Sequence, residues 1–401
     1  MPAGGVPDSR LRGPGTLLWR DGDPPIGLYV HVPFCRALCS YCTVAKGLYE
    51  TAAADRWLEA LAVEVAVRET HTWSGRPLLA TLFVGGGTPS ALTPVQWRRL
   101  GDLLAEHFRI LPGAEFTSEA NPESFDSPIA EAMHAAGVNR VSLGSQSFDP
   151  AELALLGRIH DARAPGRAVA TARAAGIENV NLDLMYGLPG QDEETFGRSL
   201  DAVMALEPDH LSAYCLSLEP GTEISRGVET GRLPRPDEDR AASLYELLVS
   251  RARSGGYEHY EISNFARPGR ESRHNLRYWT RSDVAALGPS AHALLGNHRW
   301  ANPAPLETWT RAYAAPGAAP VPRPVPLAEA RFEWIFLHLR LHRGILAGEY
   351  ATRWGESFET RYGETTERLR EAGLLRSEGG RIRLTERARF LSDAVFAEFA
   401  P

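Results

Sequence analysis

Between residue 26 and about residue 220, short apolar runs alternate with longer stretches in which apolar residues recur every three or four positions. The short runs predict buried β-strands, and the three-to-four spacing predicts helices that bury one face. Strands and helices in alternation are typical of a parallel sheet covered by helices. The predicted strands are residues 28–32, 81–85, 116–120, 140–144, 180–184 and 210–216.

Signals at helix ends support the same alternation. Thr93 followed by Pro94 predicts the start of one helix, and Gly137 predicts the end of another. Residues 135–144 and 174–184 repeat one pattern, which is a helix end, a glycine, a short turn and a strand. Six such units form a parallel sheet that is either curved into part of a TIM-type barrel or doubly wound.

The chain as a whole is predicted to have four regions. Residues 1–25 are rich in Gly, Pro and Arg and are expected to form a flexible arm before the core, residues 26–229. Residues 230–320 begin with a charged, proline-containing linker, and residues 321–401 predict helices around a hairpin, as in a small winged-helix module. This last region has 13 Arg against 12 Asp and Glu, so it lacks the positive charge of a DNA-binding module.

Charge and hydropathy exclude several classes of partner. The 401-residue chain has a formal net charge of −7, which argues against nucleic acid and anionic membranes as partners. No apolar run approaches the ~20 residues that a transmembrane helix needs, and no secretory leader is visible. Only four cysteines are present, which suits a reducing compartment. We therefore expect a soluble, cytoplasmic protein.

Three of the four cysteines lie together in a C-x3-C-x2-C pattern, as Cys35, Cys39 and Cys42, directly after the first predicted strand. Three thiolates on one tight loop can each bind a different iron of a [4Fe–4S] cluster. The fourth iron then stays open, and an open metal position is where a cofactor or substrate binds.

Three other interpretations of the cysteines are weaker. Buried cysteines can be small hydrophobic residues, but three within eight positions are too concentrated for that. A structural zinc ion needs four ligands, so the distant Cys215 or a reoriented His31 would have to complete the set. A disulfide framework is inconsistent with so few cysteines.

Polar residues follow several of the predicted strands. Gly85-Gly86-Gly87 ends the second strand, and Glu119, Gln146 and Asp183 come at the ends of later strands. In α/β folds the functional groups gather at the carboxyl ends of parallel strands. Buried polar groups are costly unless a partner pairs with them, so together these residues favour a polar ligand at this rim.

The cysteine loop resembles the cluster motif of the radical SAM superfamily. The wider string at 29–35, and further blocks at 83–90, 139–148, 156–160 and 183–191, are similar to one branch of it. That branch comprises oxygen-independent coproporphyrinogen III oxidases and haem chaperones of the HemW type. The resemblance implies an α/β fold: a partial (β/α)6 TIM-type barrel as the radical SAM core, a small α+β segment that contacts a tetrapyrrole, and a C-terminal winged-helix-like domain.

The resemblance also implies the cofactors and their ligands. In that family three cysteines hold the [4Fe–4S] cluster, and its open iron binds the amino and carboxylate groups of S-adenosylmethionine (SAM). By likeness, Gly85–Gly87 and Glu119 hold the SAM amino group, Arg158 pairs with its carboxylate, and Gln146 and Asp183 bind the ribose. The expected cluster ligands are Cys35, Cys39 and Cys42, and the expected SAM-binding residues are Tyr29, Gly85, Gly86, Gly87, Thr88, Glu119, Gln146, Arg158 and Asp183.

A second block, 274–279, resembles the H-N-x-x-Y-W motif of the same branch, whose histidine is a proposed haem ligand. That role falls on His274. The oxidases usually carry a further cysteine where this chain has Val44, and they usually have a longer N-terminal segment. Both departures favour a haem chaperone, with a coproporphyrinogen III oxidase as the alternative and a radical SAM methyltransferase or tetrapyrrole-degrading enzyme as a third reading.

The resemblance extends to partners. It implies haem or a porphyrinogen as ligand, haem-acceptor proteins such as respiratory membrane enzymes, an electron donor if the protein is catalytic, and a second copy of the chain in a homodimer. It leaves open whether the protein is an enzyme, and it assigns no residue to catalysis.

Overall fold

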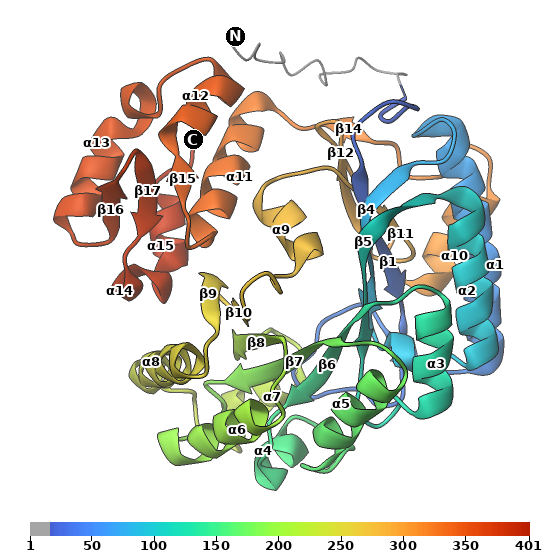
Figure 1. Cartoon of the computed structure of the whole chain (residues 1–401), viewed down its shortest axis with the longest axis horizontal. Coiled ribbons are helices and arrows are strands. Elements are labelled where there is room, and N and C mark those ends of the chain that lie inside the picture. Colours follow the sequence, from blue (N-terminus) through green and yellow to red (C-terminus); the bar gives the residue numbers. More distant parts are fainter. Residues whose placement is uncertain (1–16) are drawn as a thin grey trace.

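The computed structural model describes residues 17–401, and its centre is a parallel sheet of six strands (Figure 1). These strands lie in the order β1-β4-β5-β6-β7-β8, and each runs parallel to its neighbours. The sheet curves around a concave face, which confirms the expected radical SAM type of α/β fold. The bounds are β1 (Ile26–Val32), β4 (Leu78–Gly86), β5 (Arg109–Ala120), β6 (Arg140–Gln146), β7 (Asn179–Tyr186) and β8 (His210–Cys215).

Helices cover the convex face of this sheet because the strands present fully buried apolar side chains there. Leu28 and Val30 of β1 pack in one core with Trp57 and Trp97, which come from two of the helices. Thr93 forms a capping box with Gln96, as its position before Pro94 predicted. The covering helices are α1 (Thr51–His71), α2 (Pro94–His107), α3 (Ser127–Ala135), α5 (Ala164–Ala174) and α6 (Glu193–Ala205).

Shorter elements complete the core region, and one long helix, α8, follows it. The cysteine loop begins in β2 (Phe34–Cys35), which pairs with β3 (Gly47–Leu48) and so closes the loop at its base. The other elements are η1 (Pro89–Ala91), α4 (Pro150–Leu155), α7 (Glu223–Glu229) and α8 (Glu238–Ser254).

Five strands of the region 230–320, together with β14 just after it, extend the same sheet at both ends to twelve strands. At one end β11 pairs in parallel with β1, and at the other end β10 pairs antiparallel with β8. Helix α9 lies over the concave face, and α10 packs against α1. The elements are β9 (Glu258–Glu261), β10 (Asn264–Ala266), α9 (Arg273–Trp279), β11 (Val284–Leu287), β12 (His292–Leu295), β13 (His298–Ala301), α10 (Leu306–Ala314) and β14 (Arg323–Pro324).

The C-terminal region has its own apolar core and a three-stranded sheet in the order β15-β17-β16. The hairpin between β16 and β17 turns at Gly379 and Gly380, which both have positive φ angles. Helices around a hairpin are the arrangement that the sequence predicts. The elements are α11 (Leu327–Arg340), β15 (Ile345–Leu346), α12 (Ala347–Trp354), α13 (Phe358–Glu371), β16 (Leu375–Glu378), β17 (Arg381–Leu384), α14 (Glu386–Arg389) and α15 (Ser392–Ala397).

The expected N-terminal arm, residues 1–25, differs from the structure where the structure describes it. Trp19 is 2% exposed and forms a bridge with Trp73, so Leu18 and Trp19 pack on the core. Burial of two indole rings offsets the entropy cost of ordering this short segment. Residues 1–16 lie outside the described residues.

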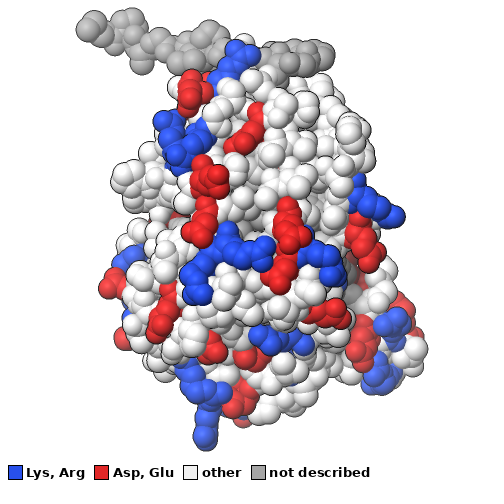
Figure 2. Space-filling model, turned by 90° about the vertical axis from the view of Figure 1, so that its right-hand side faces the viewer, with Lys and Arg blue, Asp and Glu red and all other residues white. Residues whose placement is uncertain are grey.

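Acidic and basic side chains are interspersed on the face that carries α1, α2, α3 and α10 (Figure 2). This face therefore lacks the single-sign basic surface that a nucleic-acid-binding protein presents. Among residues 17–401, no helix is both long enough and apolar enough to cross a bilayer.

Glu64 of α1 is a buried carboxylate that joins three distant segments, and its removal should destabilise the fold. It accepts hydrogen bonds from the Gly288 N–H at 2.7 Å, Asn302 Nδ2 at 2.7 Å and Trp309 Nε1 at 3.0 Å. We expect Glu64→Ala to lower the free energy of unfolding by about 3 kcal/mol, because three buried donors lose their acceptor. Urea unfolding measures the loss, and Glu59→Ala, an exposed site on the same helix, should change stability by less than ~0.5 kcal/mol.

Candidate functional site

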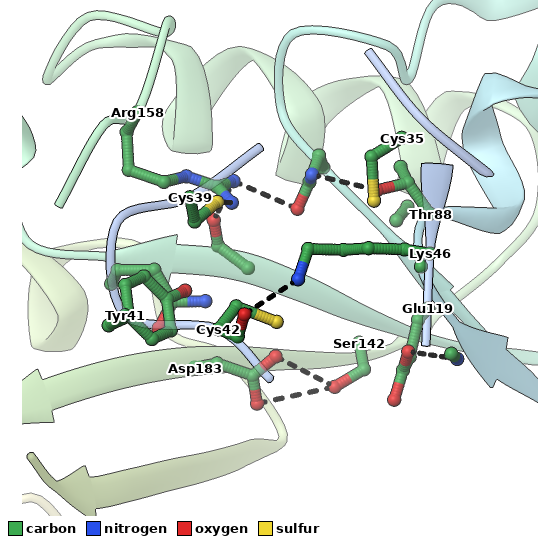
Figure 3. Close-up of a pocket in the computed structure, with 16 residues that line it drawn as sticks. Cys35, Cys39, Tyr41, Cys42, Lys46, Thr88, Glu119, Ser142, Arg158 and Asp183 are labelled. Atoms are coloured by element: carbon green, nitrogen blue, oxygen red, sulfur yellow. Dashed lines mark hydrogen bonds between the residues drawn. The ribbon is translucent and has the colours of Figure 1, made fainter. Parts of the chain in front are cut away.

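The three clustered cysteines line one cavity of about 160 Å³ at the carboxyl ends of the parallel strands (Figure 3). Cys35 ends β2, whereas Cys39 and Cys42 lie in the loop between β2 and β3. Residues of β4, β5, β6 and β7, other residues of the cysteine loop, and Arg158 from the loop after α4 form the rest of the wall. The lining residues are Cys35, Cys39, Tyr41, Cys42, Lys46, Gly86, Gly87, Thr88, Glu119, Ala120, Asn121, Ser142, Gly144, Gln146, Arg158 and Asp183.

The surroundings of the three thiols suit thiolate ligands. All three cysteines are free; Thr88 donates a hydrogen bond to Cys35 Sγ at 3.3 Å, and Arg158 donates one to Cys39 Sγ at 3.5 Å. Burial raises the pKa of Cys35, so this group ionises only if a positive partner, such as a metal, compensates. Within residues 17–401, no three His, Cys, Asp or Glu side chains converge on the position of a single metal ion. Thiols spread around a cavity fit a cluster of several irons, each with its own thiolate.

His31 holds the cysteine loop in place. Its ring is 4% exposed; one ring nitrogen hydrogen-bonds to Tyr29 Oη at 3.1 Å, and the other to the Ala45 carbonyl at 2.8 Å. The contact with Ala45 fixes the end of the loop to β1, and the contact with Tyr29, which is also in β1, orients the ring. Neither His31 nor Tyr29 lines the cavity, and neither does the exposed Cys215 at the end of β8.

The glycines at the end of β4 allow the cysteine loop to pack closely on the sheet. A Cβ on Gly86, whose φ is 113°, would lie 2.6 Å from the His31 ring. A Cβ on Gly87 would lie 2.7 Å from the Phe34 carbonyl oxygen. Both glycines also line the cavity, whereas Gly85 does not. The sequence predicts that these glycines leave space for a ligand. The structure shows that they also leave space for His31 and Phe34 of the protein itself.

Two carboxylates, Glu119 and Asp183, face the cavity. Glu119 accepts a hydrogen bond from the Gly86 N–H at 2.9 Å; burial, and then the nearby Asp183, raise its pKa to about 8. Burial also raises the pKa of Asp183, although Asn181 donates to it at 2.7 Å and Ser142 at 3.2 Å. Buried carboxyl groups with raised pKa values favour a ligand that brings a positive charge or several hydrogen-bond donors.

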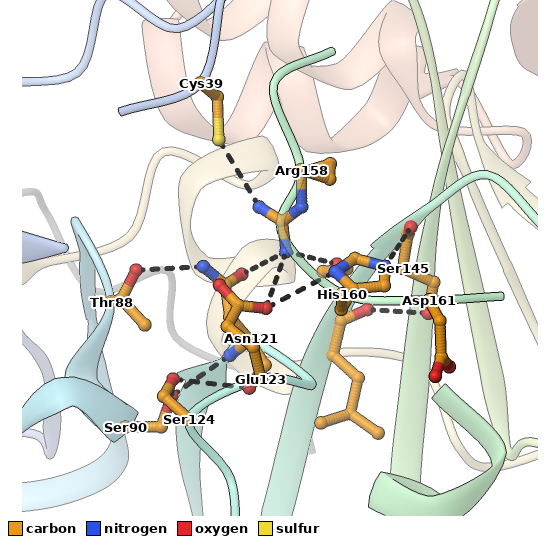
Figure 4. Close-up of polar contacts among 12 residues, drawn as sticks. Cys39, Thr88, Ser90, Asn121, Glu123, Ser124, Ser145, Arg158, His160 and Asp161 are labelled. Atoms are coloured by element: carbon orange, nitrogen blue, oxygen red, sulfur yellow. Dashed lines mark hydrogen bonds and ion pairs between the residues drawn. The ribbon is translucent and has the colours of Figure 1, made fainter. Parts of the chain in front are cut away.

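Arg158 is the cation on the opposite wall, and a polar network holds it there (Figure 4). Its side chain is 4% exposed, and Nη2 donates to Asn121 Oδ1 and to the Gly144 carbonyl, both at 2.8 Å. Glu123 lies 3.6 Å from Nη2 and 3.3 Å from His160 Nδ1. Burial by itself would lower the pKa of Arg158, but nearby Glu123, Tyr41 and Cys39 outweigh it and raise that pKa. The guanidinium is thus fixed and charged beside the cysteines, as a carboxylate-binding group should be.

Gln146 ends β6 in a backbone conformation that few residues adopt. Its φ is 63°, in the left-handed region, where a side chain other than glycine is strained. The conformation directs this residue to the cavity wall, next to Gly144. Strain of this kind at the end of a strand is typical of a functional site.

His274 lies apart from this cavity, on α9 against the concave face of the sheet. It is fully buried; Nδ1 hydrogen-bonds to Thr81 Oγ1 at 2.9 Å and Nε2 to Tyr278 Oη at 3.1 Å. Burial lowers its pKa to about 3, so the ring is neutral near pH 7. Glu115 anchors the start of α9 by accepting from the N–H groups of Arg273 and His274, both at 2.8 Å. Iron could reach a ring nitrogen only after one of these side-chain hydrogen bonds opens.

The structure adds wall residues that the sequence reasoning missed. A signal for two of them was available. Ser142 and Gly144 precede Gln146 by four and two positions in β6, and every second residue of a strand lies on the same face. Asn121 follows the end of β5, two residues after the predicted Glu119. Tyr41 and Lys46 lie within the cysteine loop, where no periodicity indicates which way a side chain points.

Comparisons with known proteins agree on one family. Residues 29–203 match the radical SAM superfamily, and residues 325–391 match the HemN C-terminal domain. A Mycobacterium tuberculosis protein named heme chaperone HemW is 40% identical over 379 residues, which cover 92% of this chain and 94% of that protein. The protein of the same name from Bacillus subtilis is 34% identical, over 92% of this chain and 98% of that one. The solved structure of Escherichia coli coproporphyrinogen III oxidase (HemN), described as a radical SAM enzyme, matches with a TM-score of 0.83 and 26% identity, over 94% of this chain and 90% of that one.

Proposed function

Because the chain belongs to the HemW family of the radical SAM superfamily, we propose that it is a haem chaperone that delivers haem to acceptor proteins. In this proposal it also binds a [4Fe–4S] cluster and SAM. The observation that carries the cofactor part is the single cavity that brings Cys35, Cys39 and Cys42 together with paired acidic groups and one fixed guanidinium. The haem part is supported by the name of the relatives that align along nearly their whole length.

We propose the following roles for the residues of the cavity. Cys35, Cys39 and Cys42 each bind one iron, and the cluster when bound supplies an open iron site and an electron. Arg158 pairs with the SAM carboxylate, because a planar guanidinium matches a carboxylate in two hydrogen bonds. Glu119 accepts from the SAM amino group. The ribose hydroxyls hydrogen-bond to Asp183 and Gln146, and Gly86, Gly87 and Thr88 complete the wall.

Two of the expected SAM-binding residues would act from outside the wall. Tyr29 hydrogen-bonds to His31, which fixes the end of the cysteine loop. A Cβ on Gly85 would lie 3.0 Å from Glu119 Cδ, so this glycine leaves room for that carboxylate. Both residues therefore position ligand-binding groups.

The specific acceptors and the location also belong to the proposal. We propose haem-requiring enzymes of the respiratory membrane as acceptors, a cytoplasmic location and a homodimer as the assembly. An electron donor is needed only if the bound cluster is reduced during function.

The second candidate function is that of an oxygen-independent coproporphyrinogen III oxidase. The observation that favours it is the TM-score of 0.83 with the oxidase from Escherichia coli. Against it, Val44 stands where the oxidases usually have a further cysteine, and this side chain is exposed at the edge of the cysteine loop.

One anaerobic assay separates the two functions. The reconstituted protein is incubated with SAM, a reductant and coproporphyrinogen III, and in parallel with haem followed by a purified apo-acceptor. We expect stoichiometric haem binding and transfer of haem to the acceptor, with coproporphyrinogen III unchanged. Formation of protoporphyrinogen would contradict the chaperone proposal and support the oxidase.

His274→Ala tests the proposed haem ligand. We expect haem affinity to fall by at least about tenfold, because loss of an iron–nitrogen bond costs more than ~1.4 kcal/mol. Cluster iron should stay unchanged, since His274 does not line the cysteine cavity. The titration follows the haem absorbance, and His71→Ala, an exposed histidine on α1, serves as the control. Equal haem affinity in both variants would remove His274 from the site.

A further inference from the structure

A second cavity, of about 610 Å³, lies between α8 and the end of α14, away from the cysteine cavity. These two helices are next to each other in the fold but about 140 residues apart in the sequence (Figure 1). A volume of this size is typical of small-molecule sites, which often lie where two regions of a protein meet. The cavity contains apolar side chains and arginines together. The apolar lining is Tyr245, Val249, Phe390 and Leu391, and the arginines are Arg253, Arg387 and Arg389.

Arg389 is the unusual residue of this wall. It is 5% exposed, and its guanidinium donates to His259 Nδ1 and to His342 Nε2, both at 3.0 Å. No carboxylate among the described residues lies within ion-pair distance of it. Burial lowers the pKa of Arg389, and the nearby Tyr245 and Glu386 only partly oppose this. A buried cation without an anionic partner within ion-pair distance is costly. The cavity therefore lacks a negative charge that would pair with Arg389.

The two histidines orient Arg389 but do not neutralise it. His342 Nδ1 donates to the His259 carbonyl at 2.6 Å, so Nε2 of this neutral ring is the acceptor for Arg389. His259 Nε2 donates to the Ile262 carbonyl at 3.2 Å, which leaves Nδ1 as the other acceptor. Burial lowers the pKa of His259 to about 3 and also lowers that of His342, so both rings stay uncharged near pH 7. The guanidinium is held rigidly and keeps its positive charge.

Acidic residues at the rim of the cavity limit how many negative charges the ligand can carry. Arg253 Nη2 forms an ion pair with Glu386 at 3.0 Å, and both side chains are well exposed. Glu238, Asp239 and Glu246 of α8 also line the cavity, so a ligand with several negative charges meets repulsion there. A ligand with one carboxylate can pair that group with the Arg389 guanidinium. Its apolar body can then pack along Tyr245 and Phe390.

We propose that this cavity binds an apolar molecule that ends in a carboxylate, with the carboxylate paired to Arg389. This site is separate from the proposed cofactor cavity and does not depend on the proposed function. A carboxylate of this kind has two sources, the end of an acyl chain or a propionate of a tetrapyrrole. Because the cavity lies between α8 and α14, a bound ligand would also fasten the C-terminal region to the core.

Binding of decanoate to the full-length protein tests the proposal, measured by calorimetry beside decanol, which lacks the charge. We expect Arg389→Met to weaken decanoate binding at least tenfold and to leave decanol binding unchanged. Arg387→Met is the matched control, because Arg387 lines the same cavity but is exposed, and it should change binding less than twofold. Leu391→Asp places a negative charge at the exposed edge of the cavity and should weaken decanoate tenfold without touching a buried residue.

Competition identifies the source of the carboxylate. If haem displaces decanoate, and Arg389→Met weakens both ligands, the ligand is a tetrapyrrole propionate. If decanoate binds equally well with and without haem, the ligand is an acyl carboxylate. Failure of haem transfer would overturn the chaperone function and leave the decanoate result standing. Absence of binding by decanoate and haem alike, or binding that neither Arg389→Met nor Leu391→Asp weakens, would overturn the proposed site.

Discussion

Cys39→Ser protein, reconstituted anaerobically, is expected to lose nearly all of its cluster iron. The wild-type protein should hold about four irons per chain with the broad brown absorbance of a [4Fe–4S] cluster. A serine hydroxyl stays protonated where a thiol ionises, so one corner of the cluster loses its anchor. Cys39 is also the thiol to which Arg158 donates a hydrogen bond at 3.5 Å. Iron analysis and the absorbance spectrum measure the loss.

The matched control for this prediction is Cys215→Ser. Cys215 is free and exposed at the end of β8, outside the cysteine cavity, so its replacement should leave the iron content unchanged. Wild-type iron stoichiometry in the Cys39 variant would contradict the ligand assignment. A single zinc ion per chain in wild-type protein prepared without added iron would contradict the cluster itself.

Glu119→Gln is expected to weaken SAM binding by about a hundredfold and to change its pH dependence. In the free protein, burial and the nearby Asp183 raise the pKa of Glu119 to about 8, so this carboxyl group holds a proton at pH 7. The SAM amino group binds best to the carboxylate, so binding releases that proton. The contribution of Glu119 to affinity therefore grows as pH rises, by about tenfold per pH unit below the raised pKa, and levels off above it.

Calorimetric titrations with SAM in buffers of different ionisation enthalpy count the released protons. Between pH 6 and 7.5, the wild-type protein should release close to one proton more than the Glu119→Gln variant. Glu106→Gln, at an exposed position on α2, is the control and should release as many protons as the wild type. The same proton count in all three proteins would show that Glu119 is not the group that receives the SAM amino group.

Local pattern was sufficient for the strands of the core and for most of the cavity. Apolar runs predict each of the six parallel strands, because a strand buried between helices must be apolar along its length. Residues that follow such strands meet at one edge of the sheet, and this brings Glu119, Gln146 and Asp183 to the same cavity. The cysteine spacing is also local, since C-x3-C-x2-C lies within a single loop.

The sequence did not predict contacts between distant segments. No local pattern indicates that Val284 pairs with Gly27, or that Asn264 pairs with Ser212, in one continuous sheet. Short strands such as β10 and β11 carry little periodicity, and their register depends on which edge of the sheet is free. The packing of Trp19 on the core was missed for the same reason, because its partner Trp73 is not visible in the local pattern.

By itself, then, the sequence determined the order of strands and helices, the cysteine loop and the rim at which polar groups gather, because these follow from local periodicity and spacing. Only the tertiary structure decided which buried polar groups have a hydrogen-bonding or oppositely charged partner. It encloses His274 between Thr81 and Tyr278 and holds Arg158 beside Cys39. It places Arg389 between two neutral histidines, with no carboxylate of residues 17–401 within ion-pair distance. The partners of a buried charge come from segments that are far apart in the sequence and meet only on folding. Local periodicity and spacing therefore do not predict them.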